Sequence, residues 1–467
     1  MVMACRRPSR RPSVDRLHAT TAPDGAIARM KVASVTQPDV LPARPVRAPV
    51  GWAARHNIYY GWLILAASGA ALFNSAVMAA STFTVFVIPM SAELGWTRTH
   101  ISTAIGIASF FAVAAPPIAG RWVDRRGGRL LLGGGSLAIG LSLIGLGFVN
   151  GFLAFYVLFG IGRMLMLGVL ELVGPTVVSN WFIRKRGLAI ATAGIVNRIG
   201  LGFWPAFASL IIVGIGWRAT WWTLGIIVCI LSIFPIWLIV GRRPEEFGLL
   251  PDGATPRPVA GERANTTVVA EPAWTLRQAS RLPVFWLLLV AVVAIGASGA
   301  GLGVHRWLYF QGNGMATSMA GVLLGSLAVG MVAGGIVAAW MLSRVSSRAT
   351  TALVVLASGA MTAGLPFVPP TFIAFVYVFF EGVALGAMYT AYPVLYADYF
   401  GRGSLGSIRG VTEPLGLAFN AFGVAIAGAL YDLNGGSYLL AFVSFGVSLM
   451  FGALLVFLSR RPVPRAA

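Results

Sequence analysis

The sequence predicts an all-α polytopic membrane protein, with twelve transmembrane helices arranged as two pseudo-symmetric six-helix bundles. Three observations lead to this fold class: the composition, the number of long apolar runs, and the distribution of basic residues over the loops. Of 467 residues, 57% are hydrophobic and 11% are charged, whereas an ordinary soluble protein has roughly 25% charged residues. The mean hydropathy is +0.80. This composition excludes a soluble enzyme, and the two cysteines, Cys5 and Cys229, offer no disulfide framework or thiolate metal site.

Twelve runs are long and apolar enough to cross a bilayer, which takes about 20 residues for roughly 30 Å of hydrocarbon. Each run is also too uniformly apolar to be a strand of a membrane barrel. The first six lie at about 60–89, 100–120, 130–149, 152–180, 187–213 and 219–241. After a polar break, six more lie at about 284–310, 316–342, 349–368, 371–397, 409–431 and 437–459.

The basic residues predict the orientation of these spans. The chain has 35 Lys+Arg against 15 Asp+Glu, a formal net charge of +20. Thirty of the basic residues fall on one side of the predicted membrane, two (Arg98 and Arg218) on the other, and three (Arg163, Arg198 and Arg306) within spans. By the positive-inside rule, both termini and the central loop are expected in the cytoplasm, with the protein in the plasma (inner) membrane. The basic charge therefore indicates topology and not nucleic-acid binding.

The spans and the polar breaks predict five parts of the chain. Residues 1–55, rich in Arg and Pro and without the apolar core of a signal peptide, are expected to be a disordered basic cytoplasmic tail. An N-terminal six-helix bundle (56–241) and a C-terminal one (284–461) follow, joined by a cytoplasmic linker (242–283). That linker is expected to be mobile apart from a surface helix at 274–281. Residues 462–467 form a short cytoplasmic tail.

An internal repeat supports the division into two halves. Asp124, in the loop after span 2, and Ser343, in the loop after span 8, are 219 residues apart. Phe182 and Phe400, in the loops after spans 4 and 10, are 218 residues apart. Offsets that agree within one residue at corresponding loops are typical of the internal repeats from which many transporters are built.

The loop after span 2 carries a motif of the form Gly-x-x-x-Asp-Arg-x-Gly-x-Arg. Its members are Gly120, Asp124, Arg125, Gly127 and Arg129, which we call the gate motif. In this position of a twelve-span chain the motif resembles that of the major facilitator superfamily, and the resemblance covers about residues 56–461. It implies two bundles around a central site, working by alternating access. It also implies that the gate motif ties the cytoplasmic ends together when the carrier opens outward.

Two further segments resemble one group within that superfamily. Residues 174–189, from Gly-Pro to Arg-Lys-Arg-Gly-Leu-Ala, and residues 398–410, beginning Asp-Tyr-Phe-Gly, look like the monocarboxylate transporter and oxalate/formate antiporter group. Three departures are visible. Span 8 has no charged residue where anion-carrying members commonly have an Arg, and Ser343 stands where an acid is expected. Span 5 also lacks the Gly-Pro-x-x-Gly-Gly motif of drug exporters.

Charged side chains inside the spans are functional candidates, because each costs about 2.5–3.5 kcal/mol or more at the bilayer centre. Arg163 and Arg198 lie near mid-depth and are candidates for binding a substrate carboxylate, whose two oxygens match a guanidinium. The alternative for Arg163 is a structural Arg satisfied by backbone carbonyls or an acid. Glu171 lies at a depth similar to that of Arg198, so we expect an ion pair between them, either structural or a charge switch.

Three more ionisable residues lie in the second half. Glu381 is near mid-depth in span 10, where burial raises a carboxyl pKa, so it is a candidate for carrying a coupling proton. A neutral Glu381 hydrogen-bonded within the bundle is the alternative. His305 is either a proton-sensitive group or a satisfied histidine. Arg306, close to the outer end of span 7, is expected to extend to the membrane interface.

Neutral polar residues complete the candidate substrate site. They are Asn74 in span 1, Tyr389 and Tyr392 in span 10, and Asn420 in span 11. Side chains of these types bind ligands when they face the centre of a bundle. They also form hydrogen bonds between helices, worth about 0.6 kcal/mol on average. Both roles stay open at each position.

These features predict a secondary active transporter for a small organic anion, in first place a monocarboxylate, coupled to protons or to exchange. The alternative is a carrier or efflux pump for neutral or hydrophobic molecules, in which the intramembrane arginines are structural. An enzyme is not expected, because no span carries paired catalytic acids, a His-rich cluster or a Ser with a His partner. We expect no cofactor, no metal and no nucleic-acid partner. The expected partners are a small-molecule substrate and the lipid bilayer, around a monomer.

Overall fold

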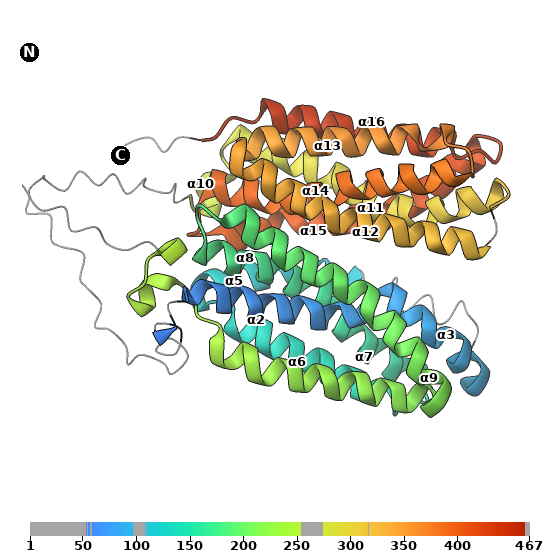
Figure 1. Cartoon of the computed structure of the whole chain (residues 1–467), viewed down its shortest axis with the longest axis horizontal. Helices are drawn as coiled ribbons and strands as arrows, with labels where there is room; N and C mark the ends of the chain where they lie inside the picture. The colour runs from blue at the N-terminus through green and yellow to red at the C-terminus, as the bar shows by residue number, and fades with distance from the viewer. Residues whose placement is uncertain are drawn as a thin grey trace, which may run out of the picture. The chain divides into compact units, whose positions relative to one another are not determined.

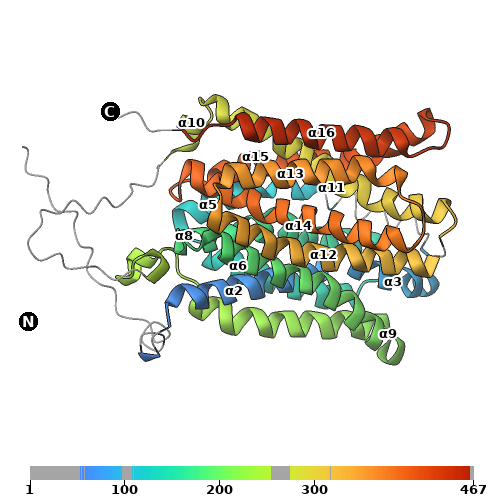
Figure 2. The ribbon, with the colours of Figure 1, turned by 45° about the horizontal axis from the view of Figure 1, so that its top comes forward.

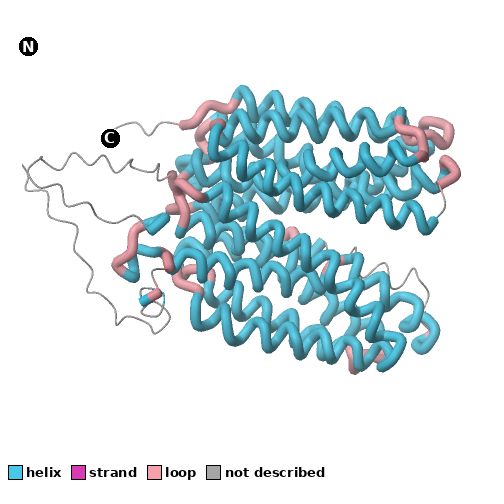
Figure 3. Tube along the Cα trace, in the orientation of Figure 1, coloured by secondary structure: helices cyan, strands magenta, loops and turns pink. Residues whose placement is uncertain are grey.

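A computed structural model describes residues 58–96, 110–253, 274–315 and 317–462, together with Ala53, Arg55, His56 and Ala108. Ala43–Ala467 form one compact unit. Within the described residues all regular structure is helical (Figure 3). The expected N-terminal tail lies almost entirely outside the described residues, and so do linker residues 254–273 and the C-terminal end from 463.

The N-terminal half consists of long helices with two irregular interruptions (Figure 1). They are α2 (Tyr60–Ser75), η1 (Ala76–Met78), α3 (Ala80–Leu94), α5 (Ala115–Arg126), α6 (Arg129–Leu146), α7 (Phe152–Met164), η2 (Leu165–Leu170), α8 (Glu171–Trp181) and α9 (Arg186–Ile239). The element η2 is a π-helical segment in the middle of predicted span 4. Helix α9 covers predicted spans 5 and 6, which are separated at Gly216, where φ is 76°. Only a residue without a side chain adopts this left-handed conformation without strain.

The linker and the C-terminal half follow in the same order as predicted (Figure 2). They contain η3 (Pro244–Phe247), η4 (Pro251–Gly253), α10 (Leu276–Ala279), α11 (Pro283–Gly312), α12 (Thr317–Arg344), α13 (Ser347–Gly364), η5 (Leu365–Phe367), α14 (Phe372–Phe400), α15 (Leu405–Leu433) and α16 (Leu439–Leu458). The surface helix predicted at 274–281 is present as α10. It begins with a capping box formed by Thr275 and Gln278.

Among the described residues, nine helices are long and apolar enough to cross a membrane, and one of these, α9, holds two spans. Predicted span 2 lies partly outside the described residues, and its remainder contains α5. The predicted fold class, an all-α polytopic membrane protein, is confirmed. The protein is a multi-pass membrane protein.

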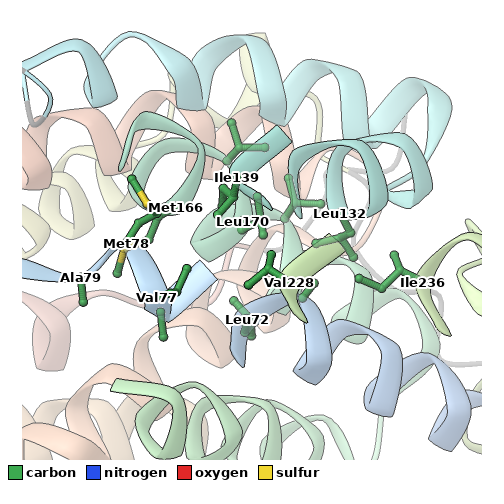
Figure 4. Close-up of a cluster of buried hydrophobic side chains, with 14 of the residues drawn as sticks. Leu72, Val77, Met78, Ala79, Leu132, Ile139, Met166, Leu170, Val228 and Ile236 are labelled. Atoms are coloured by element: carbon green, nitrogen blue, oxygen red, sulfur yellow. The ribbon is translucent and has the colours of Figure 1, made fainter. Parts of the chain in front are cut away.

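Buried apolar residues form one cluster in the N-terminal half and two in the C-terminal half. Figure 4 shows part of the first, where Leu132 and Ile139 of α6, Leu170 of η2, Val228 of α9 and Leu72 of α2 belong to one cluster of side chains. In a lipid environment the hydrophobic effect does not hold helices together, so close van der Waals packing has to do so. This explains why interior contacts depend on interlocking Leu, Val and Ile side chains and on small residues.

Candidate functional site

The two halves meet at one end of the helix bundle, which we call the basic end. It is defined by the loops at 127–128, 182–185, 345–346 and 401–404 and by linker residues 242–253. The end reached by the loops at 147–151 and 434–438 is called the opposite end.

Asp124 of the gate motif joins the halves at the basic end. Its two carboxylate oxygens accept hydrogen bonds from the backbone N–H groups of Gly406, at 2.9 Å, and Ser407, at 2.6 Å, in the first turn of α15. A helix N-terminus carries free N–H groups and a partial positive charge, so it is a natural partner for a carboxylate. Burial raises the pKa of Asp124, and the hydrogen bonds from Ser407 and Gly406 act against this rise.

The other gate-motif residues have separate positions. Gly120 lets α5 approach α15, because a Cβ at Gly120 would collide with the carbonyl of Gly406. Gly127 ends α5 with a φ of 81°. The guanidinium of Arg129 lies over the ring of Trp237, 5.8 Å from its centroid. Arg125 is exposed, and Gly120 and Asp124 make contacts with the other half that the structure describes.

Two arginines that the sequence analysis did not single out also join the halves. Arg186, at the start of α9, forms a salt bridge with Asp398 of α14 at 2.7 Å. Arg402 donates to the carbonyl of Asn180 at 2.7 Å and pairs with Glu245 of the linker at 3.1 Å. The sequence contained a signal for these contacts, namely the loop that is repeated after spans 4 and 10. Its basic residues were interpreted only as evidence for topology.

The first part of the linker is anchored at the basic end and does not match the mobile segment that the sequence predicted. The carboxylate of Asp252 accepts hydrogen bonds from the N–H groups of three consecutive residues, Ile183, Arg184 and Lys185, at 2.8–3.1 Å. These are the free donors just before α9. Because Glu245 reaches Arg402 of the second half, linker residues 244–253 contact both halves.

In the middle of the N-terminal half, Arg163 and Glu171 flank the π-helical segment η2. Arg163 donates to the carbonyl of Met78 at 3.0 Å, and its charge interacts with that of Glu171. A π-helical turn is wider than an α-helical turn and often occurs at functional sites. Here it lies between two charged residues that interact electrostatically.

The predicted ion pair between Glu171 and Arg198 is wrong. Arg198 instead reaches across to the other half, where its Nη2 donates to the carbonyl of Gly386 in α14 at 3.3 Å. Its Nη1 is buried and has no hydrogen-bond partner among the described residues. Equal depth in neighbouring helices therefore did not predict an ion pair, because Arg198 faces α14 and not α8.

The prediction that Arg306 extends to the interface is also wrong. Its guanidinium forms two hydrogen bonds with Glu381, Nε to Oε2 at 3.0 Å and Nη2 to Oε1 at 2.7 Å. The two side chains are 4% and 0% exposed. Arg306 lies on α11 and Glu381 on α14, so Glu381 has a basic partner that its own helix did not reveal.

A second buried pair was missed at the sequence level. Arg409 and Glu413, one turn apart on α15, are hydrogen-bonded. Arg409 also reaches α8, where its Nη1 contacts the hydroxyl of Thr176 at 3.3 Å and the carbonyl of Leu172 at 3.4 Å. The sequence analysis counted Arg409 among the loop residues, but it is only 3% exposed. Glu413 interacts electrostatically with Glu171, next to Leu172.

Three of the remaining candidates contact residues of their own half. Asn74 donates to Ser232 of α9 at 3.3 Å. His305 is within hydrogen-bond distance of the Tyr438 hydroxyl and the Val424 carbonyl. Tyr392 is buried and packs on Tyr396 with ring centroids 4.8 Å apart, and neither hydroxyl has a described hydrogen-bond partner.

Tyr389 and Asn420 lie together near Arg198. The Tyr389 hydroxyl and the Asn420 amide both lie within 3.1 Å of the place that a Cβ on Gly299 would occupy. Tyr389 is 41% exposed, although it lies about two and a half helical turns from the exposed Phe380 and therefore on the opposite face of α14. Its hydroxyl is within electrostatic range of Arg198, Glu171 and Arg306. We call Arg198, Tyr389 and Asn420 the central polar group.

No group of three His, Cys, Asp or Glu side chains that could hold a metal ion occurs among the residues that the structure describes. The chemistry of the interior is instead that of guanidinium, carboxyl, phenol and amide groups between two helical halves. Fold and site together define a membrane protein whose halves are tied at one end and hold polar groups between them.

Comparison with known proteins identifies the family. Residues 68–419 match the Major Facilitator Superfamily, and the chain belongs to it. The probable L-galactonate transporter of Escherichia coli K12 is 29% identical over 171 residues, 36% of this chain and 37% of the relative. The oxalate:formate antiporter of Oxalobacter formigenes is 27% identical over 247 residues, 52% of this chain and 53% of the relative. The chain thus aligns with about a third and about half of these two relatives.

The same fold occurs in solved structures. The Escherichia coli fucose:proton symporter superposes with a TM-score of 0.63 at 14% identity, covering 86% of this chain and 100% of the symporter. The predicted resemblance to the superfamily is confirmed.

Proposed function

We propose that this protein is a secondary active transporter that moves a small organic anion, in first place a monocarboxylate, by alternating access. The proposal includes the plasma (inner) membrane as location, the basic end in the cytoplasm, and a monomer as the working unit. Residues 56–241 and 284–461 are the two bundles that move against each other. The family match and the names of the two relatives, both of which describe carriers of carboxylates, support this class of substrate.

Arg198 is the observation that carries the proposal for an anion. Its guanidinium reaches from one half to the other with its Nη1 buried, has a carbonyl as hydrogen-bond partner, and has no salt bridge to a carboxylate among the described residues. An unpaired buried charge is costly, and a bound anion would relieve that cost. A guanidinium with a free Nη group offers a carboxylate a charge-assisted hydrogen bond.

The neighbours of Arg198 suit a small carboxylate with further polar groups. The Tyr389 hydroxyl and the Asn420 amide come from the other half and lie on the side of the interface that Arg198 reaches. A substrate held between these groups contacts both halves at once. Its binding therefore depends on how the halves are arranged, which is the requirement for alternating access.

Coupling to protons is assigned in this proposal to Glu171. It lies within electrostatic range of Arg163 in its own half and of Glu413 in the other. A proton on Glu171 would remove the repulsion between the two carboxylates when the halves come together. Glu381 suits this role less well because its charge is already matched by Arg306.

The test is carboxylate uptake into proteoliposomes by the full chain and by Arg198→Gln and Arg198→Lys. We expect saturable uptake of at least one of formate, acetate, lactate and oxalate. Arg198→Gln should raise the half-saturating concentration about tenfold to a hundredfold, the effect of losing a hydrogen bond to a charged group. Arg198→Lys keeps the charge without the planar guanidinium, so its half-saturating concentration should lie between those of the unsubstituted protein and Arg198→Gln.

Arg344→Gln, an exposed position at the basic end, is the control for a general loss of positive charge. A thermal-shift screen on the same preparations shows which compounds bind the native state. Stabilisation by neutral compounds alone, unchanged in Arg198→Gln, would contradict the anion proposal and favour a carrier of neutral molecules.

A further inference from the structure

One face of α5 at the basic end carries a cluster of basic and aromatic side chains that the gate does not use. Five residues at helical spacing line a cavity of about 270 Å³ there: Ile118, Arg121, Trp122, Arg125 and Arg126. The guanidinium of Arg126 lies over the indole of Trp122, 4.6 Å from the ring centroid. We call this cavity the α5 pocket.

The charges of the α5 pocket are not neutralised by the protein. Arg121, Arg125 and Arg126 are exposed, and none of them forms a salt bridge within the part of the chain that the structure describes. The nearby acid, Asp124, lies on another face of the helix and binds α15. Three uncompensated guanidinium groups within two turns favour an anionic ligand.

A buried donor independently indicates a ligand. The indole Nε1 of Trp122 is buried and has no hydrogen-bond partner among the described residues. A buried N–H without a partner costs free energy that a bound acceptor would recover. Trp122 lines the α5 pocket, and a rotation of its indole that exposes this N–H would add a donor to the three guanidinium groups, which suit phosphate oxygens.

The surface beside the α5 pocket is apolar. Ile118 is 69% exposed, and Phe111, which precedes the start of α5, is also exposed. In a membrane protein such side chains face lipid acyl chains, whereas Trp and Arg gather at the level of the headgroups. The ligand therefore needs an anionic head and an apolar tail.

We propose that the α5 pocket binds an anionic phospholipid from the leaflet at the basic end. The phosphate accepts hydrogen bonds from the Trp122 indole and from Arg121 and Arg126, and the first part of an acyl chain lies along Ile118. This site is separate from the central polar group and does not depend on what the protein transports.

The internal repeat supplies a matched control. At an offset of 218 residues, Ile118, Trp122 and Arg126 correspond to Ile336, Trp340 and Arg344 of α12. There Arg344 also lies over the Trp340 ring, at 5.3 Å. However, at this offset, which is one residue shorter than the offset between Asp124 and Ser343, Arg121 and Arg125 correspond to Ala339 and Ser343. The second half thus repeats the aromatic–cation pair without the additional charges.

The experiment measures lipid binding to the purified full chain in detergent by native mass spectrometry, with phosphatidylglycerol and phosphatidylcholine as probes. We expect preferential retention of phosphatidylglycerol. Each arginine removed from the α5 pocket should weaken this binding about fivefold, so Arg121→Gln/Arg126→Gln should weaken it about 25-fold. Trp122→Phe, which keeps the ring and removes the N–H, should also weaken it, whereas Arg344→Gln should leave it within about twofold.

Further measurements distinguish binding of a lipid from binding of a soluble phosphate compound. Glycerol 3-phosphate at equal concentration should not displace phosphatidylglycerol, because it lacks the acyl chain that Ile118 contacts. Equal retention of both lipids would overturn the proposal, and so would an equal loss in Arg344→Gln and Arg121→Gln/Arg126→Gln. Displacement by glycerol 3-phosphate would indicate a site for a soluble phosphate instead. Melting curves of each variant identify any loss that comes from misfolding.

Discussion

At the scale of single residues, the cost of an unpaired buried charge explains which side chains meet. Arg306 and Glu381 lie on α11 and α14 and are hydrogen-bonded in two places at almost complete burial. An isolated charge in this position would cost several kcal/mol, and pairing removes most of that cost. Their depths could be estimated from the sequence, but their pairing could not, because it depends on how two distant helices are rotated.

Removing one partner of this pair should therefore be worse than removing both. We expect Glu381→Gln to lower the free energy of unfolding by about 3–5 kcal/mol, because Arg306 stays buried without a counter-charge. Arg306→Met/Glu381→Leu, which leaves no charge, should recover most of that loss. Thermal melting of the purified variants in detergent measures the difference. A double variant that melts as low as Glu381→Gln would show that the charge is not what matters.

The same reasoning shows why the candidate site was only partly predictable from the sequence. Arg163, Arg198 and Tyr389 were recognisable because charged and polar residues in a span are rare. The partner of Arg198 was not recognisable, because it is the backbone carbonyl of Gly386, and a carbonyl leaves no signal in the sequence. Arg409 was counted as a loop residue because it follows Gly401 closely, although α15 begins at Leu405 and buries it.

At the scale of helices, most of the fold could be predicted from the lengths of the apolar runs in the sequence and from the places where these runs are interrupted. The break between predicted spans 5 and 6 is one such place, and in the structure α9 is interrupted there at Gly216. The sequence did not reveal the π-helical turn η2. The anchoring of linker residues 244–253 was also unexpected, because it depends on three backbone N–H groups that Asp252 satisfies.

The crossing of α5 and α15 leads to a prediction about Gly120. A methyl group there would meet the Gly406 carbonyl, so Gly120→Ala should push the helices apart at the basic end, at a cost of about 1–3 kcal/mol. Spin labels at the exposed positions Leu188 and Val345, one in each half, would report a longer distance. The labelled chain must lack Cys5 and Cys229.

Gly134→Ala in α6 is the matched control for this variant. The nearest atom that its Cβ would meet is a methyl of Leu130 at 3.7 Å, an ordinary contact. We expect its distance distribution to equal that of the unsubstituted protein. If Gly120→Ala also leaves the distribution unchanged, the close approach of α5 and α15 does not hold the basic end together.

At the scale of the whole molecule, the basic end is held by contacts of different kinds between the halves. Asp124 binds backbone N–H groups of α15, Arg186 pairs with Asp398, and Arg402 reaches Asn180. Because these contacts join elements that have to separate when this end opens, they favour the closed arrangement by their whole interaction free energy. For the basic end to open during alternating access, other interactions have to supply at least that free energy.

Asp124 is the contact whose removal should shift this balance most cleanly. Asp124→Ala loses both acceptors for Gly406 and Ser407, which are hydrogen bonds to a charged group worth about 1.5–3 kcal/mol each. Losing only 2 kcal/mol changes the ratio of closed to open molecules about thirtyfold.

We expect the labels at Leu188 and Val345 to report a mainly open basic end in Asp124→Ala. Carboxylate uptake should be lost, while the amount of protein in the membrane stays the same. Asp124→Asn keeps one acceptor oxygen, so its uptake rate and its fraction of open molecules should lie between those of the unsubstituted protein and Asp124→Ala. Normal uptake kinetics in Asp124→Ala would refute the gate, because a carrier that loses its main closing contact cannot cycle at an unchanged rate.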